Sequence, residues 1–187
     1  MLRIIGITGT LGAGKGTIVE YLKTKGFKHV AVSDTFLAGE AVRRGLTPDR
    51  IARRNIANEY RSQGPTKLME AVYVMALPFI EAGEDVVIEP QHTANEVEFI
   101  QSKGGLVFAI DADLKTRYER ISKRGSEKDN VSFEQFAAEQ KREMESIDPN
   151  KNNLGAAIAK ADHHISNNGT REELEKAIEQ ILAEIKK

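Results

Sequence analysis

Short apolar runs alternate along this chain with longer amphipathic stretches. The runs typical of strands are residues 2–8, 29–33, 85–89, 106–111 and 163–166. The first, third and fourth are nearly continuous in apolar residues, as expected for strands that helices cover on both faces. The alternation predicts an α/β fold, with three layers in which helices flank a five-stranded, mainly parallel sheet.

The clearest helical pattern lies near the end of the sequence. Its apolar residues recur at helical spacing: Leu174, Ile178, Ile181, Leu182 and Ile185. We expect Thr170 to cap this helix, with Glu172 and Glu173 in its first turn. Linkers rich in Gly, Ser and Pro are missing from the sequence, so we expect a single domain over residues 1–187, with the polar stretch 126–153 as a mobile insertion.

The most specific motif follows the first expected strand and leads into a helical pattern. It reads Gly9-Thr10-Leu11-Gly12-Ala13-Gly14-Lys15-Gly16-Thr17. The glycines let successive backbone N–H groups turn onto an anion, the helix that follows adds the positive end of its dipole, and Lys15 supplies a charge for the β- and γ-phosphates. The motif therefore predicts a nucleotide-binding site over residues 9–17.

One position departs from the general phosphate-loop motif, because Gly16 stands where Ser or Thr would hold Mg²⁺. This G-x-x-G-x-G-K-G-T form resembles the loop of adenylate and cytidylate kinases, the nucleoside monophosphate kinase family. The resemblance implies ATP as donor and Mg²⁺ held by phosphates and water, with acidic side chains nearby. Thr17 would face the α- or β-phosphate. Thr17, Asp34 and Glu89 are the candidate neighbours of the metal, partly through water.

Acidic residues follow two of the expected strands. Glu89 ends the third strand in the place of a Walker-B acid, and Asp34 lies just past the second. Ligands of open parallel sheets bind at the carboxyl ends of the strands, so both acids are candidates for Mg²⁺ and for the acceptor. Asp34 could also accept a proton from the acceptor. The alternatives are structural: Glu89 as a cap of a helix near Thr93, and Asp34 with Ser33 as the N-cap of a helix over 36–44.

Arginines form two stripes at helical spacing. Arg50, Arg54 and Arg61 share one side of a helix whose other side is apolar, which suits an acceptor phosphate, and Arg43 lies just before them. The second stripe comprises Arg117, Arg120 and Arg124. In monophosphate kinases these regions are a helical acceptor-binding insertion, here about 34–83, and a lid, here about 117–153. The lid arginines, here Arg120 and Arg124 with Arg117 behind them, neutralise the transferring phosphoryl group. The alternative for either stripe is a solvated charged face.

Two further runs carry a family resemblance. Residues 161–170 are similar to the last strand and turn of dephospho-CoA kinases, which makes Asn167 and Asn168 candidate contacts of the donor base; the alternative is an ordinary turn. The chain also resembles a group of archaeal P-loop kinases that carry an Asp-Gly-Ile-Arg type of sequence after the third strand. Here Glu89-Pro90-Gln91-His92 replaces it, so an acceptor-binding arginine is missing. His92 either contacts the acceptor or is a plain loop histidine.

Composition narrows the remaining possibilities. A formal net charge of −1 gives no electrostatic case for binding duplex nucleic acid. The sequence has no cysteine, which rules out disulfides and cysteine nucleophiles. We expect a cytoplasmic protein without a membrane segment, since no apolar stretch approaches spanning length. The pattern leaves the oligomeric state open.

Together these features predict an ATP-dependent kinase that moves the γ-phosphoryl group to a small phosphorylated acceptor, with a nucleoside monophosphate preferred. The alternative within kinases is a dephospho-CoA kinase, which needs a base for a ribose hydroxyl; Asp34 is its candidate. A different class is an NTP-driven switch or assembly factor with no small acceptor. The sequence has no Asn-Lys-x-Asp guanine signature, which argues against a GTPase switch, and the presence of Lys15 and Glu89 argues against a pseudo-enzyme.

Overall fold

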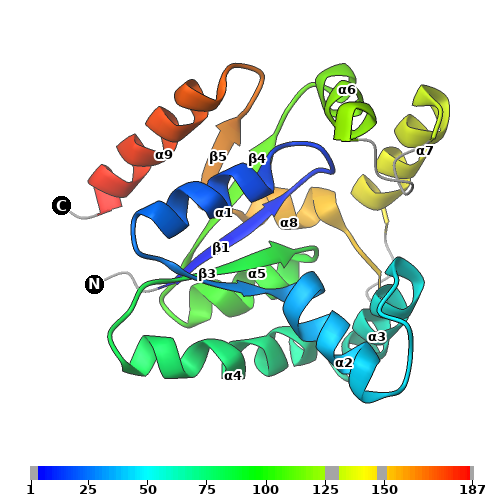
Figure 1. The fold of residues 1–187 in the computed structure, drawn as a ribbon, viewed down its shortest axis with the longest axis vertical. Coiled ribbons are helices and arrows are strands. Elements are labelled where there is room, and N and C mark those ends of the chain that lie inside the picture. The colour runs from blue at the N-terminus through cyan, green and yellow to red at the C-terminus, as the bar shows by residue number, and fades with distance from the viewer. Residues whose placement is uncertain (1–3, 125–130, 147–150, 186–187) are drawn as a thin grey trace.

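Parallel strands form the centre of the molecule. The computed structural model describes residues 4–124, 131–146 and 151–185. Its strands are β1 (Ile4–Gly9), β2 (Lys28–Ala31), β3 (Val86–Gln91), β4 (Leu106–Asp111) and β5 (His163–Ser166). They form a 5-stranded sheet in the order β2-β3-β1-β4-β5, and each neighbouring pair is parallel (Figure 1). The expected sheet is confirmed.

Strand boundaries agree with the sequence pattern at most ends. β4 and β5 have the expected limits, and β3 runs two residues further than expected, to Gln91. β1 begins at Ile4, and the first two residues of the predicted strand 2–8 lie outside the described residues. β2 ends at Ala31 instead of residue 33, because the chain turns there into a wide helical turn, η1 (Val32–Leu37).

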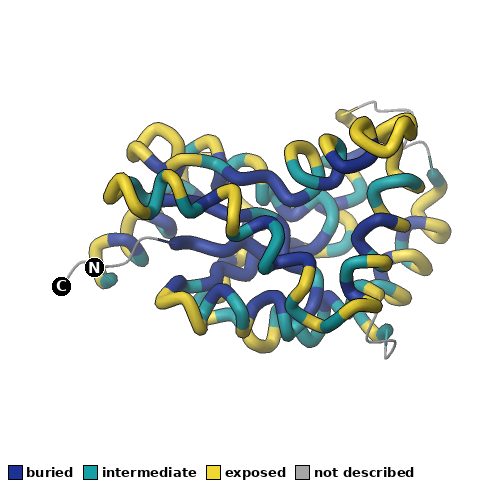
Figure 2. Tube along the Cα trace, turned by 90° about the horizontal axis from the view of Figure 1, so that it is seen from below, coloured by how far each residue is buried: buried dark blue, intermediate teal, exposed yellow. Residues whose placement is uncertain are grey.

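Helices cover both faces of the sheet (Figure 1). They are α1 (Lys15–Thr24), α2 (Ala38–Arg43), α3 (Arg50–Gln63), α4 (Lys67–Glu81), α5 (Ala94–Ser102), α6 (Leu114–Arg124), α7 (Phe133–Met144), α8 (Leu154–Lys160) and α9 (Arg171–Ile185). Successive strand residues point to opposite faces, so Ile4 and Ile88 pack under α2–α5 and α8, whereas Ile5 and Val87 pack under α1 and α9. The buried positions accordingly run through the middle of the molecule (Figure 2). α6 and α7 lie beyond the carboxyl ends of the strands.

The helix caps considered from the sequence have different outcomes. The cap of α5 is Thr93, whose side chain accepts the Glu96 N–H, and not Glu89. The α9 cap is confirmed: Thr170 Oγ1 accepts the Glu173 N–H at 3.2 Å, and the Glu173 carboxylate accepts the Thr170 N–H at 2.8 Å. The alternative that Ser33 and Asp34 cap the helix after β2 is wrong, since neither η1 nor α2 has a side-chain cap. The Asp34 carboxylate binds the Arg53 guanidinium instead, a stronger charge-assisted bond.

The polar stretch 126–153 contains a regular helix. α7 begins with a capping box between Ser132 and Gln135 and buries Phe136 against Tyr118 of α6. The remainder of the expected insertion at 126–130 and 147–150 lies outside the described residues. Among the described helices, none is both long and apolar enough to cross a membrane.

Candidate active site

The loop between β1 and α1 has the backbone that the motif predicts. Gly9, Gly12 and Gly14 have φ of 145°, 82° and 107°, in the region that favours glycine. A Cβ on Gly9 would lie 2.1 Å from the carbonyl oxygen of Ile110, and one on Gly12 would lie 2.7 Å from that of Arg117. These positions therefore admit only glycine, since the loop passes directly over the end of β4 and over α6.

Side chains from distant parts of the chain hold this loop. Thr10 Oγ1 donates a hydrogen bond of 2.5 Å to Asp111 Oδ1 at the end of β4. Asn167, just after β5, is buried and donates from Nδ2 to the carbonyl of Ala13 at 2.7 Å. The side-chain amide of Asn167 thus anchors the loop, and the Asn168 side chain accepts the Asp113 N–H at 2.8 Å. The contact of this turn with the donor base, which would be made by the backbone, stays a prediction.

Lys15 lies at the start of α1 and folds back onto the loop. Its Nζ donates to the carbonyls of Gly9 at 2.8 Å and Thr10 at 3.0 Å. Desolvation lowers the pKa of Lys15, and the carboxylates of Glu89 and Glu143 act in the opposite direction. Phosphate oxygens would be better partners for this ammonium group than neutral carbonyls.

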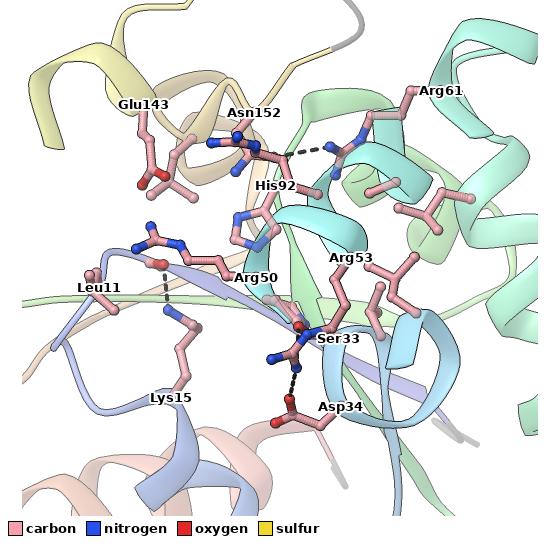
Figure 3. A pocket seen from close by; sticks show the side chains of 18 of the residues that line it. Leu11, Lys15, Ser33, Asp34, Arg50, Arg53, Arg61, His92, Glu143 and Asn152 are labelled. Atoms are coloured by element: carbon pink, nitrogen blue, oxygen red, sulfur yellow. Dashed lines mark hydrogen bonds and ion pairs between the residues drawn. The ribbon is translucent and has the colours of Figure 1, made fainter. Parts of the chain in front are cut away.

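A cavity of about 510 Å³ opens beside the loop at the carboxyl ends of β1, β2 and β3 (Figure 3). Its polar lining comprises Lys15, Ser33, Asp34, Arg50, Arg53, Arg54, Arg61, His92, Arg124, Glu143 and Asn152. Its apolar lining is aliphatic and includes Val32, Leu37, Ala57, Leu68 and Leu154. The cavity occupies the edge at which open parallel sheets bind ligands.

The first arginine stripe, on α3, faces this cavity. Arg50, Arg54 and Arg61 all line it. Arg53 was missed, because it lies to the side of the stripe on a helical wheel; its Nη1 nevertheless reaches the Asp34 carboxylate and lies 3.4 Å from Ser33 Oγ. The Asp34 side chain is exposed at the cavity mouth.

Arg61 has a different environment from the rest of its stripe. Its Nε lies 2.8 Å from Glu96 Oε1, and the two side chains are only 3% and 0% exposed. Its Nη1 donates to Asn152 Oδ1 at 3.0 Å. The positive charge of Arg61, which the sequence analysis assigned to an acceptor phosphate, is therefore balanced by Glu96 within the protein. Through these two contacts Arg61 joins α3 to α5 and to the segment before α8.

His92 lies on the cavity wall beside this ion pair. Its backbone N–H donates to Glu96 Oε2 at 2.7 Å, and its carbonyl accepts the Asn153 N–H at 2.9 Å. Desolvation, aided by the charges of Arg61 and Lys15, lowers the pKa of the His92 ring to about 3. The imidazole is thus neutral at physiological pH.

Glu143, near the end of α7, is the acidic residue that sequence reasoning missed. It points into the cavity from the side opposite Asp34 (Figure 3). Desolvation raises the pKa of Glu143, while the charges of Arg50 and Lys15 oppose that effect. Nothing in the local sequence marks it, because α7 is rich in polar residues and only its packing shows which one faces inward.

Three other arginines predicted for the site lie apart from one another, in the large cavity, in a second cavity and on the surface of α2. Arg124 lines the large cavity, whereas Arg120 lines a smaller cavity of about 190 Å³ on the other side of the loop, together with Gly14 and Thr17. Arg43 is exposed, pairs with Glu40 on α2 and does not line either cavity. It is separate from the arginines of α3 because α2 turns it outward.

Glu89 lies at the α1 face of β3. Its Oε1 is 3.6 Å from His29 Nε2, and its negative charge raises the pKa of Lys15. Glu89 does not line the large cavity. Of the candidate metal neighbours, Asp34 lines the large cavity, Thr17 lines the smaller cavity, and Glu89 lines neither. Within residues 4–124, 131–146 and 151–185, no three His, Cys, Asp or Glu side chains gather as a metal-binding group.

Comparison with solved structures supports the fold. Shikimate kinase from Bacteroides thetaiotaomicron superposes with a TM-score of 0.61 at 13% identity, covering 98% of this chain and 99% of that chain. Dephospho-CoA kinase from Campylobacter jejuni gives a TM-score of 0.58 at 17% identity, covering 99% and 98% of the two chains. At such identities the likeness concerns architecture, and the fold is that of P-loop kinases.

Sequence relatives extend over the whole chain. The AAA domain family matches residues 5–148. A UPF0200 protein of Pyrobaculum aerophilum is 32% identical and covers 100% of both chains. A UPF0200 protein of Methanocaldococcus jannaschii is 33% identical over 97% of this chain and 90% of its own length. The protein therefore belongs to the UPF0200 family and carries an AAA domain in an α/β P-loop kinase fold.

Proposed function

We propose that this protein is an ATP-dependent phosphotransferase that moves the γ-phosphoryl group to a small phosphorylated acceptor. The observation that carries this proposal is the large cavity, which is lined by five arginines and opens directly onto the phosphate loop at Gly9 and Lys15. Phosphoryl transfer requires alignment and neutralisation of charge more than covalent chemistry from the protein. An arginine-lined cavity next to a phosphate loop meets both requirements.

The donor would bind on the loop itself. The backbone N–H groups of residues 9–17 and the Lys15 ammonium would hold the β- and γ-phosphates. The smaller cavity with Gly14, Thr17 and Arg120 would take the rest of the nucleotide. Mg²⁺, if bound with the nucleotide, would neutralise negative charge on the transferring group. Glu89, which faces α1 and acts on Lys15, is the acid suited to hold it through water.

The acceptor would bind between two walls. α3, from the segment 34–83, presents Arg50 and Arg54, which form no ion pair with any residue that the structure describes. α6 and α7, from the segment 117–153, present Arg124 and Glu143 on the other side. Arg50 and Arg54 are therefore the residues suited to an acceptor phosphate, with Asp34 and Arg53 at the mouth.

Two kinds of acceptor are consistent with this charge pattern. A nucleoside monophosphate would attack through a phosphate oxygen, and the form of the phosphate loop favours it. A molecule of the dephospho-CoA type would attack through a hydroxyl, and a cavity carboxylate such as Glu143 favours that route, because a hydroxyl needs a proton acceptor. A switch NTPase would use water and would not need the acceptor arginines.

The test is a direct assay of transfer. Purified protein is incubated with Mg·ATP and, separately, with AMP, CMP, UMP, GMP, their deoxy forms and dephospho-CoA, and the products are separated by chromatography. We expect one phosphorylated product, which disappears with Lys15→Ala and weakens with Arg54→Ala. Slow ADP release that is the same with every acceptor would contradict the proposal and support the NTPase switch.

A further inference from the structure

Glu143 is a cavity carboxylate whose orientation is set by its neighbours. Arg117 is buried on α6 and donates from Nη1 to Gln140 Oε1 at 2.5 Å. Gln140, itself buried and one turn before Glu143 on α7, directs its Nε2 at the Glu143 carboxylate at 3.5 Å. The carboxylate then points into the cavity toward Arg50 and the phosphate loop (Figure 3). The Glu143 carboxylate is thus fixed in a cavity that also contains Lys15, the lysine proposed to bind the donor phosphates. This arrangement suggests a chemical role for Glu143.

A phosphate oxygen is a poor partner for this carboxylate. An attacking phosphate is already negative at neutral pH, so it has no proton that must be removed, and a second anion beside it repels it. A hydroxyl is different, since its oxygen becomes a good nucleophile for phosphorus as its proton leaves. The cavity thus offers cations for a phosphate of the acceptor at Arg50 and Arg54 and a base for a neutral O–H group at Glu143.

We propose that the acceptor attacks through a hydroxyl group and that the Glu143 carboxylate takes the proton of that hydroxyl. This inference rests on the proposed function. The hydroxyl oxygen forms a bond to the γ-phosphorus of ATP, and the bond from that phosphorus to the β,γ-bridging oxygen breaks. ADP leaves with the electron pair of that bond. The proton moves to Glu143 and from there to water, and the product is a phosphate monoester.

The charges around Glu143 are consistent with a base that works near neutral pH. Arg50 faces it from α3 and Lys15 from the phosphate loop, and both favour the carboxylate; Glu139 on its own helix opposes it. Arg124 of α6 and the neutral His92 line the same cavity. Desolvation outweighs the two cations and raises the pKa of Glu143, which moves it toward the working range of a general base.

The first readout is the chemical nature of the product. Wild-type protein is incubated with Mg·ATP and each of four probes that carry both a phosphate and free hydroxyls: AMP, CMP, ribose 5-phosphate and dephospho-CoA. Phosphorus NMR then distinguishes a monoester from a phosphoanhydride. We expect a new monoester. An anhydride would overturn the role of Glu143 and leave phosphotransfer intact, whereas release of inorganic phosphate alone with all four probes would overturn both proposals.

The second readout compares variants with the probe that is phosphorylated. Glu143→Gln keeps the shape but cannot take a proton, and we expect kcat to fall about 100-fold or more with little change in the acceptor KM. Glu145→Gln, an exposed change just beyond the end of the same helix, is the matched control and should keep wild-type kcat. The wild-type kcat should rise with pH through the pKa of Glu143, and this limb should be lost in Glu143→Gln.

Melting temperature and ATP affinity, measured on each variant, separate chemistry from misfolding. If Glu143→Gln is unstable, Glu143→Asp provides the second test, with expected partial activity and a retained pH limb. Full activity of a folded Glu143→Gln would overturn the proposal, because an amide can donate a hydrogen bond but cannot act as base. A rise in KM without a fall in kcat would overturn it as well.

Discussion

The buried ion pair of Arg61 and Glu96 allows a stability prediction. It distinguishes a structural role of Arg61, as the partner of Glu96, from a role in binding the acceptor. The change is Arg61→Met, which keeps much of the side-chain volume and removes the charge. Glu96 would keep only the His92 N–H on one oxygen and would lose its 2.8 Å partner on the other, in a site where the side chain is 0% exposed. Removing one partner of a buried ion pair costs about 3–5 kcal/mol.

For a chain of this size, 1 kcal/mol corresponds to roughly 2–4 °C in melting temperature, so the expected decrease is about 6–20 °C. Urea unfolding gives the free energy directly. The matched control is Arg54→Met, which changes an exposed arginine on the same side of the same helix, with an expected change within about 0.5 kcal/mol.

The double variant Arg61→Met with Glu96→Leu completes the cycle. Replacing both charges by apolar groups should restore part of the loss, so the double variant should be more stable than the sum of the single effects predicts. A loss below about 1 kcal/mol for Arg61→Met, together with weaker acceptor binding, would refute this reasoning and return Arg61 to the role of a substrate ligand.

Three other outcomes can be measured. Gly9→Ala should abolish ATP binding and lower the melting temperature, because its Cβ would lie 2.1 Å from a backbone oxygen. Gly16→Ala is the control and should stay folded, because the space around Gly16 is open. Equal melting curves for the two variants would contradict this prediction. The pKa of His92 is lowered from 6.5 to about 3 in the native state. Between these two pH values the unfolded chain binds a proton at His92 that the native state does not bind, so the stability of the protein should fall as the pH drops below 6.5. Between neutral pH and about pH 5.5, the wild-type protein should lose about 1.4 kcal/mol more free energy of unfolding than His92→Gln. If the stabilities of the two proteins change in parallel with pH, the His92 ring is not a neutral buried group. Arg43→Ala should leave the acceptor KM unchanged, because Arg43 pairs with Glu40 outside the cavity, while Arg50→Ala should raise it about tenfold or more, as expected for loss of a charge-assisted hydrogen bond to the acceptor.

The sequence could predict those features that depend on local pattern. Strand β4, the α9 cap at Thr170 and the positive-φ glycines of the phosphate loop follow from apolar runs, capping preference and the absence of a Cβ, respectively. The stripe of Arg50 and Arg54 follows from helical periodicity in the same way.

Features that depend on tertiary packing could not be predicted. Arg61 shares the periodicity of its stripe, but only the position of α5 shows that Glu96 compensates its charge. Glu143 is one of several acids in α7, and its role depends on how that helix packs against α6. Asp34 has the composition of an N-cap, yet Arg53 from another helix competes successfully for its carboxylate.

The bond from Asn167 to Ala13 spans nearly the whole chain. A ribosome releases β1 and the phosphate loop early, but the amide that holds this loop follows β5 and is synthesised 154 residues after Ala13. Contacts of such long sequence separation also form late during folding, because a large loop must close first. We therefore expect nascent chains that end before residue 163 to be unable to retain nucleotide. Binding competence would then arise only after β5 and the turn that follows it have been synthesised, so ATP affinity would report whether this part of the chain is present and folded.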